Sequence, residues 1–439
     1  MASRDYFKGK RIAVIGLGPH GEMIDDVKYL IKAGALVGLY DLRSEARLKT
    51  HLVFLRSIGL ANYVCGSIPA DDLLDMDLII LSEEYPRNSS FLEGLAEKKI
   101  PIEYPQTLFF RLAPPVTVVG VMGAVGKSTV ISMLAPMLEY IPKSEGNATV
   151  YVIDPETSNG CIAHLKNIKR DDIVLTKITS EMMLELHKQR LSPHISIFTT
   201  IPPRGSYTKN PFEILSYQTY NNFIIGSDAV IDATYDHKFK NQSKMLRTRP
   251  SQVPEDWVIA YRGPHDRENA ALALETARLF KINDDVAREC LEKWKSLEGR
   301  LELIKKVKNV EFYNDTASVQ SCSTETGVQA LGGEKNVVLV FGGAVTGCDY
   351  SKLYSILPKH VHSMILLPGS GTMRERLSLQ KMNDVVVRSA PSVEEAARLA
   401  LEQANKGDKV LFSPGFEATG IDRSRIERGE RFVRAVRAL

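Results

Sequence analysis

The chain has 439 residues, of which 44% are hydrophobic and 25% are charged, and its formal net charge is +3. A chain of this length is expected to fold into two to four domains. The near-neutral charge argues against a general nucleic-acid or anionic-membrane binder, and five scattered cysteines indicate neither a disulfide framework nor a zinc site. The polar start does not resemble a signal peptide, and no charge-free apolar run reaches the roughly 18 residues of a membrane span. We therefore expect a cytoplasmic protein without membrane insertion.

A glycine-rich turn comes first along the chain. Residues 11–15 have the pattern of a strand that enters the turn Gly16-Leu-Gly18-Pro-His-Gly21, and a helix and a second strand follow it. The second strand ends in Asp41, about 20 positions after the turn, as in dinucleotide-binding βαβ units. This order predicts a nucleotide diphosphate at the turn and a ribose or base contact for Asp41. The alternative is an α/β domain whose glycines serve only close helix–strand packing.

Residues 116–130 carry a second anion-binding pattern. Their first five residues are β-branched or glycine, which is typical of a buried parallel strand, and the motif Gly123-Ala-Val-Gly126-Lys127-Ser128-Thr129 follows. Inward-pointing N–H groups and the start of a helix attract phosphate there. Lys127 can reach a β- or γ-phosphate and Ser128 can ligate Mg²⁺. Valine at position 121 departs from the full phosphate-loop spacing, and a plain strand–turn–helix is the alternative.

The remaining chain alternates strands with helical stretches, which predicts the α/β class. Further strands are expected at residues 77–82, 149–154, 172–176, 195–200, 229–232, 310–313, 336–343, 363–367, 384–387 and 409–413. The sequence Pro114-Pro115 indicates a first domain boundary. In the motif Gly263-Pro-His265-Asp-Arg-Glu-Asn269, His265 and Asn269 either touch a base or phosphate or cap a helix.

The order of these motifs resembles that of the Mur ligase family, and of its D-glutamate-adding branch above all, from Gly16 to Arg428. The resemblance implies three successive α/β domains: a Rossmann-like domain for the UDP-linked substrate (1–115), a central P-loop ATPase-like domain for ATP (116–298) and a Rossmann-like C-terminal domain for the amino acid (299–439). It implies an ATP-dependent, Mg²⁺-using amide ligase of peptidoglycan precursor synthesis that acts as a monomer. ATP would phosphorylate the carboxylate of a UDP-linked muramoyl substrate, and the amino acid would attack the acyl phosphate.

The resemblance also assigns roles to single residues. Asp41 and Arg43 match uridine and diphosphate contacts, Asn159 falls near the substrate, and Asn269 falls near the adenine. Arg300 and Asp315 would hold the ribose and phosphates. The full set of expected site residues is Lys127, Lys177 and His265 for catalysis; Gly123, Gly126, Lys127, Ser128, Thr129, Asn269, Arg300 and Asp315 for ATP; Gly16, Gly18, Asp41, Arg43 and Asn159 for the substrate; and Ser128 for the metal.

The sequence departs from the family at the second metal and the amino-acid contacts. Lys177 stands where the family has a glutamate that binds a second Mg²⁺, and Thr219-Tyr-Asn-Asn222 lacks the lysine that is carbamylated there. Residues 199–204 lack an asparagine and an aspartate–histidine pair. The family's amino-acid contacts are replaced by Ala317, Val319, Thr346, Ala418 and Asp422. Either Lys177 supplies the missing positive charge or this site is no longer used; Glu181 either takes the metal or lies in solvent.

Three functions follow from these patterns. The first is a ligase of the Mur type, with D-glutamate or another amino acid as acceptor. The second is a nucleotide-binding homologue that no longer ligates and acts as a scaffold or sensor. The third is a nicotinamide-dependent oxidoreductase, which rests on Gly16–Asp41 alone; a phosphate loop at Lys127 argues against it.

Overall fold

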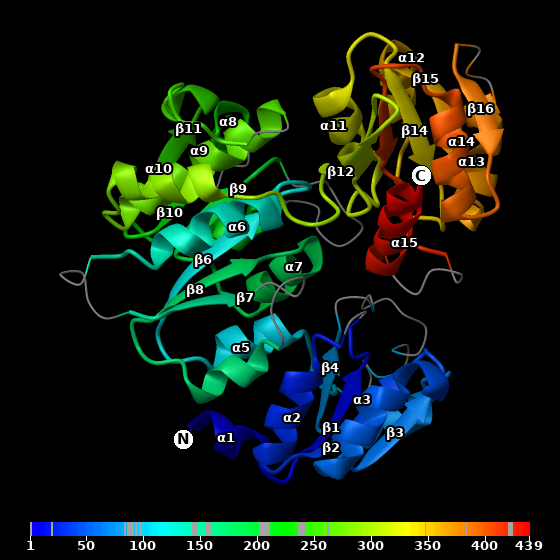
Figure 1. Ribbon diagram of the computed structural model, residues 1–439. Coiled ribbons are helices and arrows are strands. Elements are labelled where there is room, and N and C mark those ends of the chain that lie inside the picture. Colours follow the sequence, from blue (N-terminus) through cyan, green and yellow to red (C-terminus); the bar gives the residue numbers. More distant parts are fainter. Residues whose placement is uncertain are drawn as a thin grey trace. The chain divides into compact units, whose positions relative to one another are not determined.

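Three β-sheets follow one another along the chain (Figure 1), as the alternation of strands and helices predicts. The computed structural model describes residues 2–18, 21–82, 85, 92, 95, 99–142, 148–153, 160–201, 211–235, 242–260, 263–346, 348–380, 382, 384–419 and 425–439. These residues pack as two compact units. The first comprises Met1–Gly123, Leu134–Arg247 and Glu275–Ile282, and the second Ala124–Met133, Thr248–Leu274 and Asn283–Leu439.

The first sheet has the strand order β3-β2-β1-β4-β5. Its strands are β1 (Arg11–Ile15), β2 (Leu36–Asp41), β3 (Asn62–Cys65), β4 (Leu78–Leu81) and β5 (Ile102–Glu103), and its helices are α1 (Ala2–Phe7), α2 (Ile24–Lys32), α3 (Glu45–Ser57), α4 (Ala70–Leu73) and α5 (Pro105–Leu112). The strand β1 pairs in parallel with β2 and β4. Since parallel strands end at one edge, the glycine turn and Asp41 lie at the same edge of this sheet.

The central sheet has the order β11-β10-β9-β6-β8-β7. Its strands are β6 (Thr117–Met122), β7 (Val150–Ile153), β8 (Ile173–Lys177), β9 (Ile195–Phe198), β10 (Phe223–Ser227) and β11 (Lys244–Thr248). The other elements are α6 (Lys127–Leu138), η3 (Ile162–Lys166), α7 (Ser180–Lys188), η4 (Pro211–Tyr217), α8 (Asp228–Tyr235), η5 (Pro250–Gln252), α9 (Pro264–Leu279) and α10 (Asp284–Lys293). β6 pairs in parallel with both β8 and β9.

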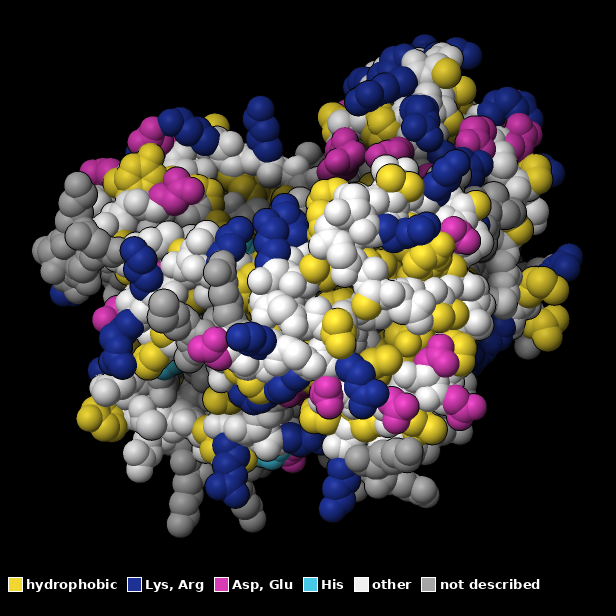
Figure 2. All heavy atoms as spheres, turned by 90° about the horizontal axis from the view of Figure 1, so that it is seen from below, with side chains coloured by type: hydrophobic (Ala, Val, Ile, Leu, Met, Phe, Trp, Pro, Cys, Tyr) yellow, Lys and Arg dark blue, Asp and Glu magenta, His cyan; other side chains and the backbone are white. Residues whose placement is uncertain are grey.

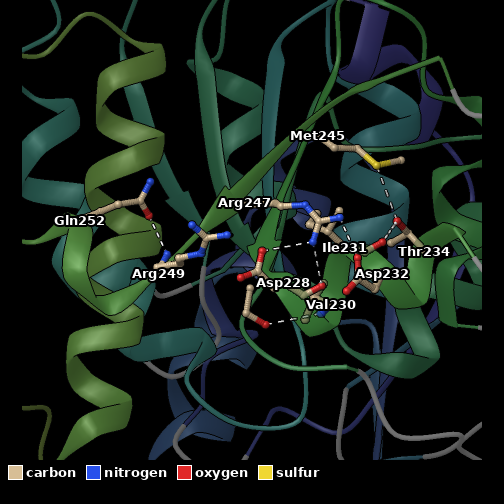
Figure 3. A network of polar contacts seen from close by, with 10 residues as sticks. Asp228, Val230, Ile231, Asp232, Thr234, Met245, Arg247, Arg249 and Gln252 are labelled. Atoms are coloured by element: carbon tan, nitrogen blue, oxygen red, sulfur yellow. Dashed lines mark hydrogen bonds and ion pairs between the residues drawn. The ribbon is translucent and has the colours of Figure 1, made fainter.

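The expected strand at residues 229–232 is wrong, because these residues belong to the helix α8. The strand is β10, which lies just before them. The Ser227 hydroxyl accepts a hydrogen bond from the N–H of Val230 at 3.5 Å, in the manner of a helix N-cap. The outer strand β11 is held to α8 by Arg247, which pairs with Asp228 at 3.2 Å and Asp232 at 2.7 Å (Figure 3).

The third sheet has the order β12-β13-β17-β14-β15-β16. Its strands are β12 (Glu302–Val307), β13 (Val310–Asn314), β14 (Val337–Phe341), β15 (Val361–Leu366), β16 (Val386–Ser389) and β17 (Lys409–Phe412), and its helices are α11 (Ser321–Leu331), α12 (Ser351–His360), α13 (Ser370–Gln380), α14 (Val393–Gln403) and α15 (Arg425–Ala438). Only β12 and β13 pair antiparallel among the described pairs.

The β14 run explains how this sheet forms two cores. Val337, Leu339 and Phe341 belong to one buried cluster, while Val338 and Val340 belong to another. Side chains alternate between the faces of a strand, so a continuous apolar run requires burial on both sides.

On the face drawn in Figure 2, Lys and Arg side chains are interspersed with Asp, Glu and apolar ones. None of the helices that the structure describes is long and apolar enough to cross a membrane.

Candidate functional site

The carboxyl end of β6 leads into the predicted phosphate loop. Gly123 follows the buried strand with φ of +130°, a conformation that favours glycine. A Cβ at Gly123 would lie 2.2 Å from Thr199 Oγ1 and 2.9 Å from the backbone nitrogen of Thr200. The Thr199 hydroxyl donates to the carbonyl of Met122 at 3.0 Å. The end of β9 therefore packs so closely on the loop that only glycine fits at its start.

The second half of the loop opens the helix α6. Gly126 has φ of +90°, and a Cβ there would lie 2.6 Å from Asn269 Oδ1. Lys127 Nζ donates to the carbonyl of Ala124 at 3.1 Å, and the side chains of Ser128 and Thr129 are buried at the start of the helix. The predicted strand–turn–helix is thus present; the binding of phosphate at these residues stays a prediction.

The two polar residues of α9 differ in their surroundings. Asn269 lies in the second turn of the helix rather than at its start, so it is not a cap, and its buried amide faces Gly126. His265 lies in the first turn, partly exposed, with Nε2 3.6 Å from Asp266 Oδ1. This distance is too long for a direct hydrogen bond. Asn269 is therefore beside the phosphate loop, as expected for a nucleotide contact, whereas the catalytic role of His265 stays untested.

Lys177 is buried at the carboxyl end of β8. In the pairing of β8 with β6, Lys177 lies opposite Val121, two residues before Gly123. A lysine is rarely buried unless its ammonium interacts with other groups. Its side chain belongs to the edge of the central sheet at which ligands bind in parallel α/β folds.

In the first sheet, hydrogen bonds to Asp41 hold the glycine turn in place. Its fully buried carboxylate accepts hydrogen bonds from the backbone of Leu17 at 3.3 Å and from the backbone of Arg43 at 2.8 Å. The Arg43 guanidinium bonds to the same carboxylate and donates to the carbonyl of Gly18 at 2.9 Å. Gly16 and Gly18 both have φ of +78°. The structure thus brings the four substrate residues Gly16, Gly18, Asp41 and Arg43 together; their nucleotide contacts stay predictions.

Asp315 has a comparable structural position after β13. It is buried, and its carboxylate accepts from Ser413 Oγ at 2.7 Å and from the backbone of Leu301 at 3.1 Å. Burial raises the pKa of Asp315 to about 6, against the opposing effect of these hydrogen bonds and of nearby Arg300. The expected ATP contacts Arg300 and Asp315 are therefore neighbours.

Comparison with known proteins relates these sites to one family. The model of the Mur ligase, glutamate ligase domain matches residues 299–416. Two curated relatives, both named UDP-N-acetylmuramoylalanine–D-glutamate ligase, come from Roseiflexus sp. (strain RS-1), at 26% identity over 98% of both chains, and Clostridioides difficile (strain 630), at 24% identity over 97% of this chain and 98% of the relative. The chain is thus similar over nearly its whole length to curated Mur ligases, and residues 299–416 match the glutamate ligase domain of that family.

Solved structures of Mur ligases share the fold. A murein peptide ligase from Psychrobacter arcticus superposes with a TM-score of 0.63 at 13% identity, covering 98% of this chain and 99% of the other. MurC from Thermotoga maritima gives a TM-score of 0.61 at 15% identity with the same coverage. At such identities the similarity establishes the three-sheet fold.

One residue at which the sequence departs from the expected Mur ligase pattern has described surroundings. Thr346, where the resemblance places a lysine, has its Oγ1 2.9 Å from the hydroxyl of Tyr350. Tyr350 in turn donates to the carbonyl of Gly415 at 2.7 Å and stacks on Phe416 with ring centroids 4.7 Å apart. The position is therefore occupied by a neutral hydroxyl chain rather than a cation.

Some expected residues cannot be placed. Asn159, Asp422 and residues 202–204 lie outside the described residues, and so does the side chain of Glu181. No statement on these positions follows from the structure.

Two residues with a part in this geometry were missed from the sequence. Tyr350 carried no signal, because its partners Gly415 and Phe416 lie more than 60 residues further along the chain. Asp26 did carry a signal in the sequence. It lies four residues before Leu30 and therefore on the same buried face of α2, where apolar residues are usual.

Proposed function

We propose that this Mur ligase homologue joins an amino acid to the carboxylate of a UDP-linked muramoyl substrate, at the expense of ATP. The observation that carries the proposal is the phosphate loop between β6 and α6, whose glycines are required both by φ and by close neighbours. The relatives' names supply the reaction class, since they are peptidoglycan precursor ligases. We further propose that the protein acts in the cytoplasm and as a monomer.

The phosphate loop suits the chemistry of acyl phosphate formation. Lys127 would neutralise the β- and γ-phosphates, and Asn269, Arg300 and Asp315 would hold the adenine, ribose and phosphates. Among the described residues, no three His, Cys, Asp or Glu side chains gather as a metal site by themselves. The buried Ser128 hydroxyl is a suitable oxygen ligand for one Mg²⁺ shared with ATP. Bound there, Mg²⁺ would stabilise negative charge on the phosphates.

Lys177 does not suit a second Mg²⁺, because an ammonium cannot ligate a cation. We propose instead that the buried ammonium stabilises the negative charge of the transferred phosphoryl group. The substrate carboxylate would attack the γ-phosphorus, ADP would leave, and the amine would then displace phosphate from the acyl phosphate. Lys177 would act in the first of these steps.

The first sheet would hold the uridine diphosphate part of the substrate. Arg43, fixed by Asp41 and by the carbonyl of Gly18, presents a guanidinium at the glycine turn. A guanidinium and a glycine-rich strand–helix turn are both suited to phosphate. We keep residues 1–115, 116–298 and 299–439 as the proposed domains for the uridine nucleotide, ATP and the amino acid.

The amino acid is proposed to differ from D-glutamate. Ala317, Thr346 and Ala418 offer no cation to its two carboxylates, and Thr346 is engaged with Tyr350. Each lost charge-assisted hydrogen bond to a carboxylate costs about 1.5–3 kcal/mol. A homologue that binds nucleotides without ligating is the second candidate, favoured by the same substitutions.

Phosphate release tests both candidates. The protein is mixed with ATP, Mg²⁺ and UDP-N-acetylmuramoyl-L-alanine, and each member of an amino-acid panel is added separately. We expect release that depends on one amino acid, with D-glutamate used poorly, and none with Lys127→Ala. Robust release with sub-millimolar D-glutamate would refute the proposed amine preference. The absence of amine-dependent release across the panel would instead support the homologue without ligase activity.

A further inference from the structure

A buried carboxylate joins the first and central sheets within one compact unit. Asp26 of α2 is 1% exposed, and its carboxylate accepts hydrogen bonds from two backbone N–H groups of a segment that begins 135 residues further along the chain. The N–H of Cys161 lies 2.8 Å from Oδ1 and 3.0 Å from Oδ2, and the N–H of Ala163 lies 2.8 Å from Oδ1. Cys161 is the N-cap residue of η3 and Ala163 is the second residue of η3, and the side chain of Cys161 makes no capping hydrogen bond. Asp26 thus caps η3 from another element.

The contact continues toward the glycine turn. The N–H of Gly160 donates to the carbonyl of Glu22 at 2.6 Å, and a Cβ on Gly160 would lie 2.8 Å from Asp26 Oδ1. Glu22 directly follows Gly21, and its Oε2 lies 2.1 Å from the place a Cβ on Gly18 would occupy. Asp26, Gly160, Glu22 and Gly18 therefore form a continuous series of contacts from η3 to the proposed diphosphate-binding turn.

Capping alone does not account for an ionisable group at this position. Burial raises the pKa of Asp26 to about 7, so that the hydrogen bonds from backbone N–H groups only partly offset the loss of hydration. A serine or asparagine beside η3 would satisfy an N–H without this penalty. The carboxylate, with two acceptor oxygens, is able to hold Cys161 and Ala163 at once.

We propose that Asp26 is a positioning residue for the nucleoside diphosphate part of the substrate. By fixing the start of η3 against the first turn of α2, it holds Gly160 on Glu22 and thereby sets the geometry of the turn at Gly16 and Gly18. The inference rests on the proposed binding of a uridine nucleotide at this turn, but not on ligase activity.

The test measures the affinity for UDP by calorimetry together with the hydrogen exchange of the Cys161 and Ala163 amides. In Asp26→Ala we expect at least tenfold weaker UDP binding, faster exchange of both amides and unchanged affinity for ATP. Asp26→Asn keeps one acceptor oxygen and the volume, so it should fold and bind with intermediate affinity. Asp25→Asn is the matched control, because the neighbouring carboxylate is 43% exposed and pairs only loosely with Lys28 at 3.8 Å; its UDP affinity should equal that of the parent.

A second variant changes the η3 side of the contact with Asp26. Gly160→Ala should push η3 away from Asp26 and weaken UDP binding in the same manner. Faster amide exchange with unchanged UDP affinity in folded Asp26→Asn and Gly160→Ala would overturn the inference, because the carboxylate would then only stabilise η3. If the parent protein does not bind UDP, both the proposed function of the turn and this inference are refuted. If the parent and the variants bind UDP equally, only this inference is refuted.

Discussion

At the scale of residues, Lys177 stands where the resemblance to Mur ligases places a glutamate, so the sign of the charge is reversed there. Lys177 ends β8 beside the strand that precedes the phosphate loop, and it is buried. A surface lysine at this point would indicate drift at a disused site, since such a side chain is easily accommodated in water. A buried ammonium requires interactions that offset its desolvation, and in the proposed reaction the transferred phosphoryl group adds one more.

Neutralising Lys177 tests its role directly. Lys177→Met preserves the apolar stem and approximate volume, so the fold should persist. We expect turnover to fall about a hundredfold or more, as for other groups that stabilise transition-state charge, with little change in ATP affinity. Lys188→Met is the control, because that lysine is 55% exposed on α7. Equal turnover of Lys177→Met and the parent would show that the ammonium takes no part in the reaction.

At the scale of elements, the strand–turn–helix around Gly123 and Gly126 is the proposed binding site for ATP. Both glycines have positive φ, and both have polar neighbours where a side chain would begin. The sequence predicted this element from an apolar strand and a glycine motif, despite the valine at position 121. The resemblance placed Asn269 near the adenine, but the close approach of its amide to Gly126 depends on how α9 packs and required the structure.

Replacement of Gly126, compared with replacement of Gly407, distinguishes the effect of backbone strain from the loss of ATP binding. Gly126→Ala and Gly407→Ala both place alanine where φ is near +90°, but only Gly126 has a neighbour within 4 Å. Each should lower the free energy of unfolding by about 1 kcal/mol through strain. We expect Gly126→Ala alone to lose ATP affinity, tenfold or more, as measured by calorimetry. Unaltered ATP binding in Gly126→Ala would contradict the assignment of this loop to phosphate.

At the scale of the whole molecule, sequence patterns were sufficient for the three α/β sheets but not for the contacts between distant segments. Apolar runs and their alternation with helices predicted most strands, and a strand at residues 229–232 was wrong because Ser227 starts a helix there. The substitutions at Lys177 and Thr346 were visible as departures from a family pattern. Their surroundings, and the contact of Asp26 with η3, required the structure because they join residues far apart in the sequence.

The most direct test of the central claim follows oxygen atoms through the reaction. A UDP-linked muramoyl substrate whose carboxylate carries a heavy oxygen isotope is incubated with ATP, Mg²⁺ and the preferred amino acid, and the products are weighed by mass spectrometry. An ATP-dependent ligase that forms an acyl phosphate transfers one labelled oxygen to inorganic phosphate and yields the amide. Unlabelled phosphate, or phosphate released without an amide product, would contradict the proposed ligase.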